Sequence, residues 1–114
     1  MLEALFASVG LSPRGPVAWD LAIPAAEPGV YVIVRAGEVV YVGYAARSLA
    51  RRLQEFYRHQ YGAKALQRAG QDSLQVQTPL QVYWALTDDP RQAAAEMLRW
   101  FSRRLGHLPI GNRK

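Results

Sequence analysis

The chain has no cysteine and only two histidines, His59 and His107, and these shortages exclude several kinds of site. Without thiols there is neither a disulfide framework nor a thiolate metal centre. Two histidines are also too few for a histidine-rich metal cluster. Any metal bound to this protein would therefore need ligands that are mainly oxygen atoms.

Long apolar runs are also missing from the 114 residues. A membrane-spanning helix needs about 20 predominantly apolar residues, and no segment approaches that length. The N-terminus lacks the basic region, apolar stretch and cleavage site of a secretory signal. We therefore expect a cytoplasmic protein with no membrane partner. A chain of this length forms a single domain, with an N-terminal extension over residues 1–27 and a core over residues 28–112.

Acidic residues are scarce in two parts of the chain, although the net charge is only +5. Residues 45–70 contain six basic side chains against Glu55 alone, and residues 99–114 contain five basic side chains and no acidic one. Such blocks favour contact with a polyanion, and nucleic acid is the partner we expect. The alternative is that these arginines only solvate exposed helix faces.

The segment over residues 29–43 predicts a β-hairpin. It consists mostly of β-branched and aromatic residues, and a short polar stretch around Gly37 supplies the turn. Side chains alternate between the faces of a strand. Alternation predicts one shared face for Tyr31, Ile33 and Arg35 in the first strand, and one for Val39, Tyr41 and Gly43 in the second. The two tyrosines are therefore expected on the same side of the sheet.

Helical periodicity and capping residues define the other elements. We expect a first helix over residues 2–9 and a second that begins at Ser48 as its N-cap. A third helix should begin at Asp89 and Pro90 and end at Gly106. A third strand is expected over residues 79–86. The element order is helix, strand, strand, helix, strand, helix. This order predicts an α+β protein.

Two charged side chains stand out within the predicted helices. Helical geometry places Arg52 with Leu49 and Phe56 on the packed side of its helix. A half-buried arginine needs an anionic partner, either Glu96 in an ion pair or a bound phosphate. Glu96 itself follows three alanines. It is either a surface glutamate or a single carboxylate that shares a divalent ion with waters and substrate phosphate.

Several short motifs, taken in order, resemble the GIY-YIG nuclease family. They are Pro-Gly-Val-Tyr at residues 28–31, Tyr-Val-Gly at 41–43, the arginine helix at 47–53, Glu96, and Pro-Ile-Gly-Asn at 109–112. The resemblance implies a β-β-α-β-α core in which helices flank a three-stranded antiparallel sheet. It further implies hydrolysis of phosphodiester bonds in DNA.

The resemblance also implies a role for particular residues. Tyr31 would be the general base or would position water, with Tyr41 assisting, and Arg52 would neutralise charge on the phosphoryl oxygens. Glu96 would hold one Mg²⁺ or Mn²⁺ ion. The expected substrate contacts are Gly43, Arg47, Arg51, Arg58, Lys64 and Asn112, of which Asn112 also supports the site.

Three functions remain open at this stage. The first is a metal-dependent endonuclease of low or structure-based specificity. The second is a catalytically inactive nucleic-acid-binding module on the same scaffold. It is favoured by Tyr44, where many relatives carry Lys or Ser, and by Phe56, where they carry His or Tyr. The third is a protein-interaction domain with an apolar patch of Trp84, Trp100 and Phe101.

Overall fold

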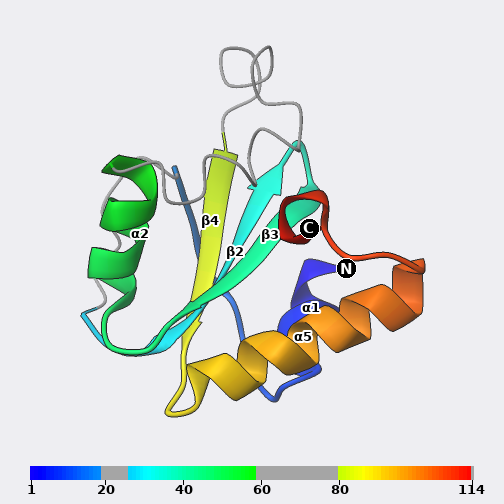
Figure 1. Ribbon diagram of the computed structural model, residues 1–114, viewed down its shortest axis with the longest axis horizontal. Coiled ribbons are helices and arrows are strands. Elements are labelled where there is room, and N and C mark those ends of the chain that lie inside the picture. The colour runs from blue at the N-terminus through cyan, green and yellow to red at the C-terminus, as the bar shows by residue number, and fades with distance from the viewer. Residues whose placement is uncertain (19–25, 59–79, 114) are drawn as a thin grey trace.

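The computed structural model describes residues 1–18, 26–58 and 80–113. Its elements are α1 (Leu2–Ala7), β1 (Arg14–Ala18), β2 (Gly29–Arg35), β3 (Glu38–Ala45), α2 (Leu49–Arg58), β4 (Leu80–Leu86), α5 (Pro90–Leu105) and the 3₁₀ turn η1 (Ile110–Asn112) (Figure 1). Of the expected substrate contacts, Lys64 and the side chain of Arg58 lie outside the described part.

The sheet is antiparallel and contains four strands in the order β1-β4-β2-β3. The α+β class is therefore confirmed, whereas the expectation of three strands is wrong. The additional strand, β1, lies in the part that the sequence predicted as an extension. Its Gly15 and Pro16 interrupt strand patterns, but an edge strand tolerates them because one side of its backbone needs no ladder bonds.

The β2–β3 hairpin turns through Ala36 and Gly37, whose φ angles of 49° and 80° are both positive, as a type I′ turn requires. Past the turn, Val34 pairs with Val39 but Ile33 pairs with Tyr41, so the register shifts by one residue. This bulge breaks the alternation. The expectation that Val39 and Tyr41 share one face of the strand is therefore wrong, because Val39 packs on the opposite side of the sheet from Tyr41.

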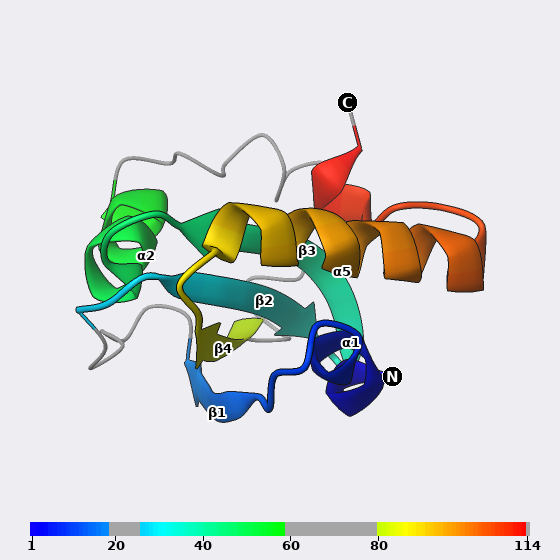
Figure 2. The same cartoon turned by 90° about the horizontal axis from the view of Figure 1, so that it is seen from below.

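Two hydrophobic clusters occupy the two faces of the sheet, and a different set of helices covers each face (Figures 1 and 2). On one face, Leu49 and Leu53 of α2 pack with Tyr31 and its neighbours; we call this the α2-side cluster. On the other face, α1 and α5 contribute the α5-side cluster, formed around Leu5, Phe6, Val30, Val32, Met97 and Phe101. The sheet is thus the middle layer of three.

The predicted helix boundaries rest on caps that the structure contains. Ser48 Oγ accepts a hydrogen bond of 3.2 Å from the backbone N–H of Arg51, and Asp89 Oδ1 accepts one of 3.4 Å from that of Gln92. Gly106 ends α5 with a left-handed φ of 79°. In the described part of the chain, no helix is long and apolar enough to cross a membrane.

Candidate functional site

Tyr31 and Gly43 are cross-strand partners in the hairpin, and their contact explains the motif glycine. A Cβ atom at position 43 would lie 2.5 Å from Cζ of Tyr31 and 2.6 Å from its hydroxyl oxygen. The Tyr31 side chain is fully buried, including that hydroxyl. A general base must reach its substrate. In this arrangement Tyr31 is a core residue, while Tyr41, with its ring centroid 6.1 Å away, is only half-buried.

A concavity of about 300 Å³ lies where β3, α2 and α5 come together. Ten residues line it, four of them from β3, one from α2, four from α5 and one from η1. They are Tyr41, Val42, Gly43, Tyr44, Arg52, Arg91, Ala94, Ala95, Leu98 and Asn112. The structure therefore brings together four of the predicted site residues. They are Tyr41, Gly43, Arg52 and Asn112.

A second concavity, of about 560 Å³, adjoins the first at the start of α2. It is lined by Tyr44, Ala45, Ala46, Arg47, Ser48, Arg51 and Arg52, so that Tyr44 and Arg52 belong to both. We call the two concavities together the arginine groove. Its described lining contains four arginines and no carboxylate. The expected contacts Arg47 and Arg51 thus line the same concavity as Arg52.

Asn112 fixes one wall of this groove. Its Oδ1 accepts a hydrogen bond of 2.9 Å from the Val42 N–H, and its Nδ2 donates one of 2.9 Å to the Val42 carbonyl oxygen. The side chain thereby pairs with β3 as a neighbouring strand would. Gly111 allows the close approach, because a Cβ there would lie 2.5 Å from the Val40 carbonyl oxygen. Asn112 therefore positions η1 and β3 rather than facing outward as a free donor.

The first turns of both helices at the groove lack acidic residues. Helix N-termini carry partial positive charge and normally attract acidic side chains. Here the first turns carry Arg51 in α2 and Arg91 in α5, while the carboxylate of Asp89 already caps the N-terminus of α5. The charge of the arginines, rather than the dipole of α5, therefore favours an anion between the two helices. Sequence reasoning missed Arg91, although an arginine directly after the Asp-Pro cap was a usable signal.

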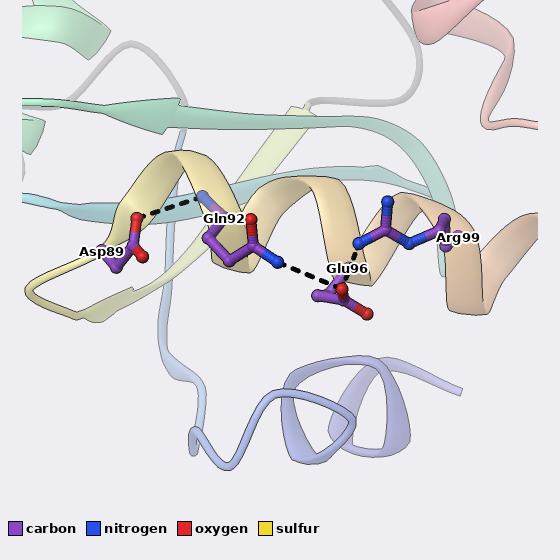
Figure 3. Close-up of polar contacts among 4 residues, drawn as sticks. All are labelled: Asp89, Gln92, Glu96 and Arg99. Carbon is purple, nitrogen blue, oxygen red and sulfur yellow. Dashed lines mark hydrogen bonds and ion pairs between the residues drawn. The ribbon is translucent and has the colours of Figure 1, made fainter.

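Glu96 does not join this group. Figure 3 shows Gln92, Glu96 and Arg99 in a row along the side of α5 that faces away from β3. Gln92 Nε2 donates a 3.2 Å hydrogen bond to Glu96 Oε1, and Arg99 forms an ion pair with the same oxygen. The pair considered from the sequence, between Glu96 and Arg52, is therefore not formed. The Glu96 side chain is 41% exposed.

The described residues around the groove do not fit a divalent cation. Mg²⁺ and Mn²⁺ select carboxylate, carbonyl and water oxygens. The groove offers arginines instead, and no group of three or more His, Cys, Asp or Glu side chains occurs in the described ranges. The role of Glu96 as a metal ligand thus stays a prediction from family resemblance that this geometry does not support.

The aromatic residues of the third alternative are mostly internal. Trp84 and Phe101 are buried at 7% and 3% exposure, and Trp100 is half-buried beneath Arg104, whose guanidinium carbon lies 5.4 Å from the ring centroid. They belong to different sides of the sheet, since Trp84 is in the α2-side cluster and the others are in the α5-side cluster. They do not form one apolar patch.

Comparison of the chain with models of known protein families, with curated proteins and with solved structures found no match. The similarity to the GIY-YIG family therefore rests on the short motifs alone.

Proposed function

We propose that this protein binds nucleic acid, DNA in the first instance, by holding the phosphodiester backbone in the arginine groove without a divalent metal. The observation that carries the proposal is the composition of the groove. Four arginines line it, and no described lining residue is acidic. Guanidinium groups bind phosphate oxygens through paired hydrogen bonds and stay charged at every physiological pH.

The shape of the groove favours a chain of phosphates over a single anion. Its two concavities follow one another along the end of β3, with Arg47 in one, Arg91 in the other and Arg52 in both. Arg47, Arg51 and Arg91 are exposed, so a ligand can reach them. A polyanion would engage several of these charges at once and release a counterion at each.

Salt dependence of binding tests this proposal. We would measure the affinity for a labelled oligonucleotide across a salt series, for the native protein, for Arg47→Ala with Arg91→Ala, and for Arg99→Ala with Arg103→Ala. Both double variants lose two positive charges, but only the first pair lines the groove. We expect the groove variant to reduce the salt slope by roughly 1.4 to 1.8, because each of the two lost phosphate contacts contributes about 0.7 to 0.9.

If the two double variants lost the same amount of affinity, the proposal would be contradicted, since this would indicate attraction by net charge alone. Equal affinity for a polyglutamate chain would also contradict it, because the protein would then attract any polyanion through its net charge. Arg99→Ala also releases Glu96, so folding of each variant has to be checked by its thermal unfolding.

A metal-dependent endonuclease is the second candidate. It is favoured by one observation, namely that Tyr41, Arg52 and Asn112 surround the same groove. These are three of the positions at which the motifs resemble the family. Arg52 would stabilise charge on the phosphoryl oxygens, and Tyr41 would contact the attacked phosphate. The described lining lacks the carboxylate that such a reaction would need.

The two candidates differ in one assay. Labelled single-stranded, duplex and branched DNA would be incubated with Mg²⁺, Mn²⁺ or a chelator, beside folded Arg52→Ala and Glu96→Gln variants. Metal-dependent cleavage that both substitutions abolish would support the endonuclease. Binding without cleavage, weakened by Arg52→Ala and unaffected by Glu96→Gln, is the result that we expect.

A further inference from the structure

Tyr44 is a large aromatic residue in an unusual setting. It lies near the end of β3 and is 38% exposed, and in the described residues only Met1 and Leu105 are other large apolar side chains with comparable exposure. Alternation along the strand places it on the side of Val42, which is buried under α5. Unlike Val42, Tyr44 is exposed, and it lines both concavities of the arginine groove.

Arginines flank Tyr44 on both sides. The concavity toward α2 adds Arg47 and Arg51, the one toward α5 adds Arg91, and Arg52 lines both. An exposed ring between cationic pockets provides the two parts of a binding surface for a single-stranded nucleic acid. The ring offers a face for a base, and the arginines offer contacts for the phosphates before and after it.

We infer that the arginine groove binds single-stranded nucleic acid, with one base stacked on Tyr44. This inference rests on the function proposed above. In a duplex the faces of the bases are stacked on one another, so the ring of Tyr44 would have no free base to contact. A single strand exposes its bases, and its flexible backbone can follow the two adjoining concavities.

The same lining predicts weak sequence preference. Every base has an aromatic face, so stacking accepts all of them. Apart from the arginines and tyrosines, the polar side chains of the described lining are Ser48 and Asn112, and both already bond to the backbone of this chain. Few groups are thus left to read the edges of a base.

The test compares four proteins, the native chain and its Tyr44→Ala, Tyr44→Leu and Tyr44→Phe variants. Each is titrated with a labelled single strand and with the corresponding duplex at one salt concentration. We expect the native protein to prefer the single strand. Tyr44→Ala and Tyr44→Leu should weaken single-strand binding by about 5- to 150-fold, the range that stacking of one base supplies, with little change for the duplex. Tyr44→Phe keeps the ring and should retain the affinity.

A single strand that contains 2-aminopurine gives a second readout, because the fluorescence of this base falls when it stacks. The native protein and Tyr44→Phe should quench it, and Tyr44→Leu should not. Tighter binding of the duplex, or equal single-strand affinity for all four proteins, would overturn the role of Tyr44. The proposed nucleic-acid binding would still stand in that case if substitution of the groove arginines weakened it. Absence of binding to any oligonucleotide would overturn both.

Discussion

The ring of Tyr31 lies directly against the Cα atom of Gly43 on the neighbouring strand, and the hydroxyl group of Tyr31 is enclosed there. The contact joins the two motifs of the hairpin. It also explains, without any reference to catalysis, why an aromatic residue and a glycine face each other across these strands.

Gly43→Ala should destabilise the protein by about 1 to 3 kcal/mol, because the new methyl group would overlap a ring that has no room to move in the core. Urea unfolding measures this change. The matched control is a double-mutant cycle with Tyr31→Leu, which removes the ring. If Gly43→Ala costs as much beside Leu as beside Tyr, the contact is not the cause.

Asn112→Ala should lower stability by about 1 to 3 kcal/mol, since two hydrogen bonds to Val42 are lost. Hydrogen exchange at the Val42 amide should become faster as well. Asn112→Asp is the informative comparison. It keeps an acceptor for that amide and loses the donor to the carbonyl, so the amide should remain protected while stability still falls. Unchanged exchange in Asn112→Ala would disprove the pairing.

Asp89→Ala should cost about 1 kcal/mol, because Asp89 caps α5 through the Gln92 amide (Figure 3). Asparagine caps nearly as well, so Asp89→Asn should be close to neutral in thermal unfolding. Asp88→Ala changes the adjacent exposed residue and should stay within about 0.5 kcal/mol of the native protein. Similar losses at both positions would point to charge rather than capping.

Chelation of divalent metal should leave oligonucleotide affinity unchanged when ionic strength is held constant. The arginine groove offers its own positive charge and, among the described residues, no acidic ligand. Glu96→Gln should leave the affinity unchanged, because Glu96 is paired with Arg99 and does not line the groove. Loss of binding on adding a chelator would show that a metal takes part.

The helix ends and the hairpin turn were predictable from the sequence. Ser48, Asp89 and Gly106 define helix ends through contacts a few residues away, and Gly37 defines the turn in the same way. These features depend little on the rest of the fold. The grouping of Tyr41 with Arg52 around one concavity was implied by the family resemblance and not by the periodicity of either segment.

Features that depend on distant packing were not predictable. The bulge at Val40 redirects Val39, and β1 exists only because β4 offers it a partner. The orientation of the Glu96 side chain also depends on distant packing. Family resemblance assigned it to the site, whereas Met97 and Phe101 turn α5 so that its apolar side meets the sheet and Glu96 faces outward. The spacing of apolar residues on α5 was the better guide to that side chain.

The two walls of the arginine groove belong to opposite layers of the protein. Arg52 belongs to the helix that covers the α2-side cluster, Arg91 belongs to the helix that covers the α5-side cluster, and residues of β3 line the same concavity as both. A ligand that touched both arginines would act as a clamp across the edge of the sheet. Binding would then raise the cooperativity with which the two layers unfold, and a core substitution on either side would alter the width available to the ligand.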